Sequence, residues 1–132
     1  MINIDQITRV YFVGIGGIGM SALARFFNEK GAVVTGYDKT ETALTKTLVT
    51  EGIAIHYEDN INLLDKEANL VVYTPAIPAD HQELNWYRDQ GYTVVKRSDV
   101  LQAISQQMYS ITIGGTHGKT TISTMIAHIL RD

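Results

Sequence analysis

Two glycine-rich segments of the chain have the composition of phosphate-binding loops. Residues 14–19 carry glycine at their first, third and sixth positions, and residues 114–121 contain the run Gly-Lys-Thr-Thr. Glycine lets the backbone approach a phosphate closely, and the free amides of a helix N-terminus bind anions. The two loops differ in chemistry, because only the second contains a lysine. The sequence therefore predicts two nucleotide sites of different kinds.

The second loop has the residues of an ATP and magnesium site. Lys119 would place its ammonium near the β and γ phosphates, and the Thr120 hydroxyl would bind Mg²⁺. These two are the candidate catalytic residues. The usual P-loop has a glycine at the position that Ile113 occupies here, so this loop is one residue shorter. The candidate ATP-binding residues are Gly114, Gly115, Thr116, His117, Gly118, Lys119, Thr120 and Thr121. For His117, a phosphate contact and a plain loop position are equally open.

The first loop has the spacing of a dinucleotide-binding turn. Gly14 would permit the tight turn, Gly16 the approach of a diphosphate, and Gly19 close packing of helix on strand. Asp38 ends the next apolar run, about twenty residues further on, where an acid accepts hydrogen bonds from ribose hydroxyls. NAD is the default ligand of such a loop, but a UDP-sugar offers the same diphosphate and ribose.

These loops must be positioned by an alternation of strands and helices. Apolar runs at 10–13, 33–37, 53–56, 69–73, 93–96 and 109–113 predict strands, and residues 18–30, 42–51, 80–90, 99–106 and 119–131 have helical character. Asp80 and Ser98 are expected to cap their helices. Such an alternation predicts a Rossmann-like α/β fold with a doubly wound parallel sheet.

A third segment follows the fourth strand at the edge where ligands of such folds bind. The proline at 75 ends the strand, because proline cannot donate to the sheet. The hydroxyl of Thr74 and the backbone at Ala76 would then contact a base or ribose, and a proline-stiffened loop without a ligand is equally open.

Composition limits the classes of protein. The 132 residues carry a formal charge of −3 and no cysteine, which excludes disulfides and thiolate metal sites. A general nucleic-acid or membrane-surface binder would need a basic patch, and the lysines and arginines are scattered. The N-terminus has no secretory signal and no apolar run is long enough to cross a bilayer, so we expect a cytoplasmic protein.

At this point the loops resemble those of the Mur ligases. The segment 114–121 is similar to the short ATP loop of that family, and residues 13–21, 73–78 and 96–101 resemble other segments of it. The resemblance spans essentially the whole chain. It implies three domains, for a UDP-sugar, for ATP and for an amino acid. Residues 1–107 would be the UDP-N-acetylmuramate-binding domain, and residues 108–132 the opening strand and helix of the ATPase domain.

The resemblance also implies a bacterial cytoplasmic enzyme of peptidoglycan synthesis. ATP would convert the lactyl carboxylate of UDP-N-acetylmuramate to an acyl phosphate, which the amine of L-alanine attacks. L-alanine would need the C-terminal domain, so the chain is expected to bind the UDP-sugar without ligating it. The residues implied for the UDP-sugar are Gly14, Gly16, Gly17, Ile18, Gly19, Met20, Asp38, Thr74, Pro75 and Ala76.

Two alternatives stay open. One is the branch of the family that joins a murein tripeptide to the same sugar nucleotide, and the other is a regulatory module with NAD in its first loop. The strand at 109–113 and the helix at 119–131 are rich in apolar residues. Alone they cannot bury that surface, so this segment is expected to pack back on the domain, to self-associate or to be poorly ordered.

Overall fold

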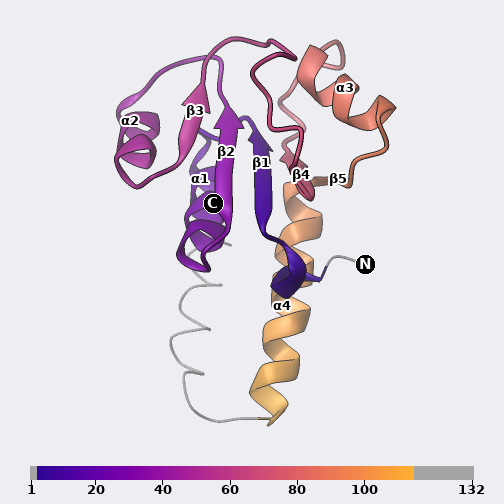
Figure 1. Ribbon diagram of the computed structural model, residues 1–132. Helices are drawn as coiled ribbons and strands as arrows, with labels where there is room; N and C mark the ends of the chain where they lie inside the picture. Colours follow the sequence, from indigo (N-terminus) through magenta and orange to yellow (C-terminus); the bar gives the residue numbers. More distant parts are fainter. Residues whose placement is uncertain (1–2, 115–132) are drawn as a thin grey trace.

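A parallel five-stranded sheet forms the centre of the molecule (Figure 1). The computed structural model describes residues 3–114. The strands are β1 (Arg9–Val13), β2 (Val33–Tyr37), β3 (Ala54–His56), β4 (Leu70–Tyr73) and β5 (Val94–Lys96). Their order in the sheet is β3-β2-β1-β4-β5, and every neighbouring pair is parallel. This order confirms the predicted Rossmann-like fold, because the chain winds outward from β1 in both directions.

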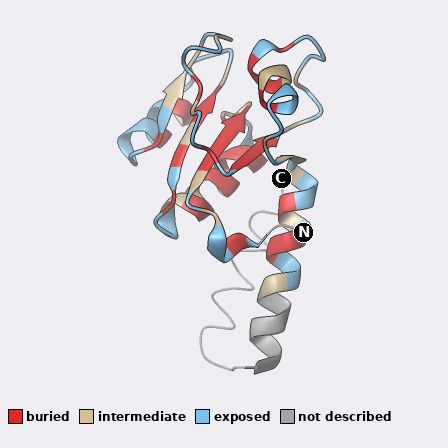
Figure 2. Ribbon diagram, turned by 45° about the vertical axis from the view of Figure 1, so that its right-hand side comes forward, coloured by how far each residue is buried: buried red, intermediate tan, exposed pale blue. Residues whose placement is uncertain are grey.

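Helices and one long loop cover the two faces of the sheet. The helices are α1 (Ile18–Glu29), α2 (Ala43–Thr50), α3 (Gln82–Asp89) and α4 (Arg97–Gly114), and a short 3-10 turn, η1 (Ile4–Gln6), precedes β1. Residues of α1, α2 and α4 share one core with the sheet, whereas α3 and the connection 57–69 contribute to the core of the other face. Figure 2 shows that the buried residues concentrate along the strands and on the sides of the helices that face them.

Strand β1 supplies both cores, because successive side chains of a strand point to opposite faces. Val10 and Phe12 pack in the core with α1, while Tyr11 and Val13 pack in the core with α3. All four side chains are fully buried. A central parallel strand buried on both faces has this continuous apolar sequence.

The last described helix corrects one expectation from the sequence. Residues 109–113 were expected to form a sixth strand, but α4 continues through them to Gly114, the last residue that the structure describes. A strand there would need a neighbouring strand for its backbone groups, whereas a helix satisfies them internally. The residues after Gly114, with most of the second loop and the expected helix at 119–131, lie outside the described residues. Within residues 3–114, no helix has the length and apolar character needed to span a membrane.

Candidate nucleotide-binding cleft

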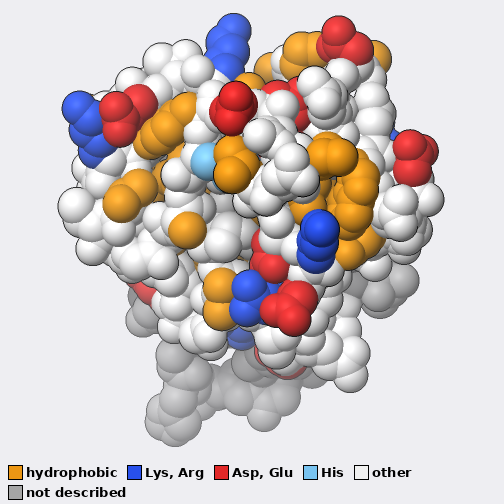
Figure 3. All heavy atoms as spheres, turned by 45° about the horizontal axis from the view of Figure 1, so that its top comes forward, with side chains coloured by type: hydrophobic (Ala, Val, Ile, Leu, Met, Phe, Trp, Pro, Cys, Tyr) orange, Lys and Arg blue, Asp and Glu red, His pale blue; other side chains and the backbone are white. Residues whose placement is uncertain are grey.

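A cleft of about 540 Å³ opens where β1, β2 and β4 end. It lies at the point where the strand order reverses, since β2 and β4 flank β1 on opposite sides. Ligands of doubly wound sheets bind at this position. Figure 3 shows the molecule from this end of the sheet, with acidic and basic side chains scattered among uncharged ones rather than gathered in one basic patch.

The glycine loop forms the first wall of the cleft. Gly14 has a φ of +92°, a conformation that side chains other than glycine rarely adopt. The N–H groups of Gly14 and Ile15 both donate to the Tyr37 carbonyl, at 2.8 and 2.9 Å, and this ties the loop to the end of β2. Helix α1 then starts with Gly17 at its N-cap, without a side-chain cap and without an acid in its first turn. The first amides of α1 are therefore not occupied by a side chain and suit an anion.

Asp38 lies directly against the glycine loop. Its Oδ2 accepts a hydrogen bond of 2.8 Å from the Gly16 N–H, and its Oδ1 accepts one of 3.1 Å from the Thr40 N–H. A Cβ atom on residue 16 would lie 2.6 Å from Asp38 Oδ2 and 2.9 Å from Thr45 Cγ2. A side chain at this position would therefore displace Asp38 or Thr45, before any ligand is considered.

The turn after β4 covers the loop from the other side. The Thr74 hydroxyl accepts from the Ala76 N–H at 3.3 Å, and the Thr74 carbonyl accepts from the Ile77 N–H at 3.2 Å. Ile77 Cδ1 lies 3.2 Å from the position of a Cβ on Gly14. Thr74, Ala76, Ile77 and Pro78 all line the cleft. The turn thus narrows the cleft over the glycine loop.

The start of α3 forms the far wall, and its cap differs from the expected one. Asp80 was expected to cap this helix, but His81 occupies the N-cap position and makes no side-chain cap hydrogen bond. The capping carboxylate is that of Asp59, which accepts from the Gln82 N–H at 2.9 Å and the Glu83 N–H at 3.0 Å. A residue from the preceding loop therefore fixes the helix start, and this was not visible in the local sequence.

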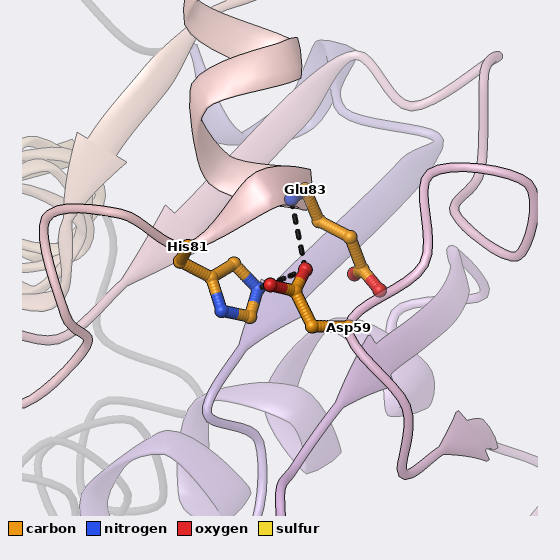
Figure 4. Close-up of side chains that lie close together, drawn as sticks. All are labelled: Asp59, His81 and Glu83. Carbon is orange, nitrogen blue, oxygen red and sulfur yellow. Dashed lines mark hydrogen bonds and ion pairs between the residues drawn. The ribbon is translucent and has the colours of Figure 1, made fainter.

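Asp59, His81 and Glu83 gather in one cluster beside the cleft (Figure 4). Their ligand-type atoms lie within 4.8 Å of one another. Carboxylates and an imidazole are metal-ligand types, but these carboxylates already accept other hydrogen bonds. Asp59 accepts the two helix amides, and Glu83 accepts from the Tyr11 hydroxyl and from the Asn60 N–H. The cluster is thus explained as a helix cap joined to a buried polar network.

Glu83 is the centre of that network. Its side chain is fully buried, and its Oε2 lies 2.8 Å from His56 Nε2. The Tyr11 hydroxyl donates to Oε1 and lies 3.1 Å from the same imidazole nitrogen. Burial, followed by the Glu83 charge, raises the pKa of Tyr11 far above its ordinary value. Burial and the charges of Asp59, Glu83 and Asp38 also raise the pKa of Tyr37.

The structure brings six of the ten residues predicted for the UDP-sugar to this end of the sheet. The cleft is lined by Gly14, Gly17, Asp38, Thr74 and Ala76, and Gly16 contacts Asp38.

Other predicted residues lie differently. Gly19 is buried in α1, the Met20 side chain is part of the hydrophobic core, and Ile18 is 70% exposed. Pro75 does not line the cleft. The ATP-loop residues after Gly114, including Lys119 and Thr120, lie outside the described residues.

The sequence reasoning missed several residues that line the cleft. Tyr37 and Lys39 flank Asp38 at the end of β2, and the rule that ligands bind at strand ends could have found them. Asp59, His81 and Gln82 come from a loop and a helix start. No local pattern indicates that these segments meet, because the path of the loop depends on tertiary packing.

Comparison with known proteins gives a consistent match. The model of the Mur ligase family, catalytic domain, matches residues 9–109. The chain is 52% identical over 128 residues to the UDP-N-acetylmuramate–L-alanine ligase of Porphyromonas gingivalis, covering 93% of the chain and 28% of that protein. It is 51% identical over 132 residues to the ligase of the same name from Flavobacterium johnsoniae, covering 97% of the chain and 29% of that protein. The chain thus spans less than a third of the length of these relatives.

Solved structures give the same result for the fold. The UDP-N-acetylmuramate–alanine ligase MurC from Thermotoga maritima superposes with a TM-score of 0.72 at 31% identity, covering 76% of this chain and 23% of that one. A murein peptide ligase from Psychrobacter arcticus has a TM-score of 0.66 at 25% identity, covering 76% of this chain and 20% of that one.

Proposed function

The chain belongs to the Mur ligase family, and we propose that it binds the UDP-sugar in a ligase that joins L-alanine to UDP-N-acetylmuramate. The observation that carries this proposal is the cleft at the switch point of the sheet, where the uncapped start of α1 and Asp38 lie together. The identity of about half of the residues to ligases of that name supports the choice of ligand.

Each wall of the cleft suits one part of such a ligand. The amides at the start of α1 would bind the diphosphate, because they carry partial positive charge and have no side-chain cap. The Asp38 carboxylate would accept from ribose hydroxyls, and Gly14, Gly16 and Gly17 would let the phosphates approach the backbone. The turn at 74–76 would contact the ribose or base, and Ile18, Gly19 and Met20 would contribute through the backbone of α1.

In the whole ligase, the second loop would serve ATP. We assign residues 1–107 to the UDP-sugar domain and residues 108–132 to the start of the ATP-binding domain. Lys119 and Thr120, outside the described residues, would hold the ATP phosphates and Mg²⁺. When bound, Mg²⁺ offsets negative charge on the transferred phosphoryl group. The reaction would form an acyl phosphate on the lactyl carboxylate and then an amide with L-alanine, in the cytoplasmic synthesis of peptidoglycan.

The alternative branch, which transfers a murein peptide, has less support. The chain is 25% identical to the murein peptide ligase of known structure, against 31% to the alanine ligase of known structure and 51–52% to the alanine ligases of Porphyromonas gingivalis and Flavobacterium johnsoniae. Both branches would use the same sugar nucleotide, so the proposed role of the cleft is the same in either.

Titration calorimetry with UDP-N-acetylmuramate and with NADH tests the proposal. We expect the UDP-sugar to bind and NADH to bind weakly or not at all. Asp38→Ala should weaken UDP-sugar binding roughly tenfold, since hydrogen bonds to a charged group are lost, while Asp89→Ala, on an exposed position at the end of α3, should leave it unchanged. Tight binding of NADH without binding of the UDP-sugar would overturn the proposal.

A further inference from the structure

The His81 side chain is buried in the cleft wall, although it does not make the hydrogen bonds that cap α3. It is 5% exposed and lines the cleft together with Gly17 and Asp38. It occupies the N-cap of α3, but Asp59 provides the hydrogen bonds that cap this helix. A buried polar ring normally has hydrogen-bond partners, so the absence of a capping bond calls for another role.

Two neighbours hold the imidazole ring in place. Its Nε2 lies 3.3 Å from Asp59 Oδ1 but completes no hydrogen bond with the described residues. The Tyr37 ring packs on it, with 4.7 Å between ring centroids and 56° between the planes. Figure 4 shows one ring nitrogen facing the Asp59 carboxylate and the other on the opposite edge, away from Asp59 and Glu83.

The nearby carboxylate favours one tautomer of the neutral ring. An unprotonated Nε2 would place its lone pair against the negative Asp59 Oδ1, so the hydrogen is favoured on Nε2. In a neutral imidazole the other nitrogen, Nδ1, is then an acceptor. No described residue donates to Nδ1 of His81, which leaves this acceptor available to a ligand.

The two walls of the cleft suit different parts of a nucleotide. The glycine loop and α1 offer N–H donors, while the far wall carries the carboxylates of Asp59 and Asp80 beside His81. A diphosphate has acceptors and negative charge, so the far wall would repel it. A nucleoside carries donors, namely the ribose hydroxyls and, in uracil, the N3–H.

Together these observations point to a role in specificity. The geometry points to His81 as a specificity-determining residue for the uridine part of the ligand, with Nδ1 accepting a hydrogen bond from the nucleoside. This inference rests on the proposed function and adds a recognition residue to the same cleft.

Substitution of His81 by asparagine or by glutamine distinguishes the roles of its two ring nitrogens. The amide of asparagine reaches the position of Nδ1, and the amide of glutamine reaches that of Nε2. We expect His81→Asn to bind UDP within about threefold of the unmodified chain and His81→Gln to bind roughly tenfold more weakly, the loss of one hydrogen bond. Calorimetry with UDP measures both, and thermal unfolding checks that each variant is folded. His81→Gln that binds UDP as tightly as the unmodified chain overturns the inference.

Nucleotide analogues identify the donor. If uracil N3–H donates, the unmodified chain should prefer UDP to CDP, whose N3 has no hydrogen, and His81→Gln should lose that preference. If a ribose hydroxyl donates, either 2′-deoxy-UDP or 3′-deoxy-UDP should bind the unmodified chain as weakly as UDP binds His81→Gln. Each of these results supports the inference. Equal binding of all four nucleotides by the unmodified chain contradicts it.

Nitrogen NMR of the unmodified chain tests the inference without any variant, so the test does not depend on whether a variant folds. Histidine nitrogen NMR should show Nε2 of His81 protonated and Nδ1 unprotonated, with the Nδ1 signal shifting when UDP is added. An Nδ1 signal that UDP does not move overturns the inference. An unmodified chain that binds NADH but no uridine nucleotide overturns the proposed function as well, so the two failures are distinguishable.

Discussion

The Asp38 carboxylate accepts a 2.8 Å hydrogen bond from the Gly16 N–H, so the end of β2 is joined to the glycine loop before any ligand binds. The contact leaves no room for a side chain at position 16, where a Cβ would lie 2.6 Å from Asp38 Oδ2. The loop and the acid that are proposed to bind one ligand are therefore parts of a single packed unit.

Gly16→Ala should destabilise the fold and displace Asp38. Overpacking of this kind costs about 1–3 kcal/mol, and the UDP-sugar affinity should fall with it. Gly17→Ala is the matched control for stability. Its Cβ would have no neighbour closer than 3.8 Å, so we expect the loss of a glycine N-cap alone, below about 1 kcal/mol. Urea unfolding measures both, and equal losses would show that the contact with Asp38 does not restrict position 16.

Asp59→Ala should destabilise α3 although residue 59 is 23 positions before the helix start. Both helix amides that Asp59 satisfies would lose their acceptor, at a cost of about 0.5–2 kcal/mol. Asp80→Ala is the control, because Asp80 is adjacent in sequence to the helix cap but the cap hydrogen bonds come from Asp59. Thermal unfolding should show a lower midpoint for the first variant only. A lower midpoint for Asp80→Ala than for Asp59→Ala would instead show that Asp80 caps the helix, as the sequence predicted.

Glu83→Gln should destabilise the fold by about 1–3 kcal/mol, because an amide cannot accept from the Tyr11 hydroxyl, the His56 ring and the Asn60 N–H at once. Glu67→Gln changes the same group on an exposed side chain, 4.0 Å from Arg9 Nε, and should change stability by less than about 0.5 kcal/mol. Free energies of unfolding from urea titration compare the two. Similar values for both would argue that the Glu83 network contributes nothing specific.

Alkaline pH should unfold the protein through its buried tyrosines. Burial, with the nearby acidic groups, raises the pKa of Tyr11, Tyr37 and Tyr87 above the value near 10 of the unfolded chain. The contribution to stability is complete below pH 10. Above it the unfolded chain loses protons that the folded chain keeps, so each tyrosine lowers stability by up to about 1.4 kcal/mol per pH unit until the pH reaches its folded pKa.

Tyr87→Phe makes the alkaline prediction quantitative. Removing one hydroxyl should lower the pH dependence above pH 10 by one proton. The ultraviolet absorbance of tyrosinate should rise for the buried tyrosines only when the protein unfolds. Ionisation of these residues in the folded state, seen as absorbance that precedes the loss of helical circular dichroism, would contradict the assignment.

Much of the fold could be predicted from the sequence, because apolar runs indicate buried strands and glycines indicate where helices end. The apolar runs predicted the five strands and their parallel arrangement, and glycines such as Gly31 and Gly52, both with positive φ, follow helix ends where expected. The prediction was wrong at 109–113, where the isoleucines that favour a strand also fit a helix. The local sequence cannot decide between strand and helix at these residues, because a strand also depends on pairing with a neighbouring strand.

Only the part of the candidate site that lies at the strand ends could be predicted from the sequence. Gly14, Gly17 and Asp38 are tied to strand ends, and their meeting follows from the topology of the sheet. The far wall depends on how the connection 57–69 returns across the sheet, which is decided by side chains such as Leu64 and Ala68 in the second core. The partnership of Asp59 with α3 is a consequence of that packing, so the sequence alone did not reveal it.

The two walls of the cleft come from separate stretches of the chain, residues 14–39 and residues 59–82. A molecule that contacts both walls is a non-covalent cross-link between these stretches. By mass action it stabilises the folded state by RT ln(1 + [L]/Kd), and it opposes any partial opening in which one wall detaches from the other. Amide hydrogen exchange at the start of α3 should therefore slow when a ligand binds at the glycine loop.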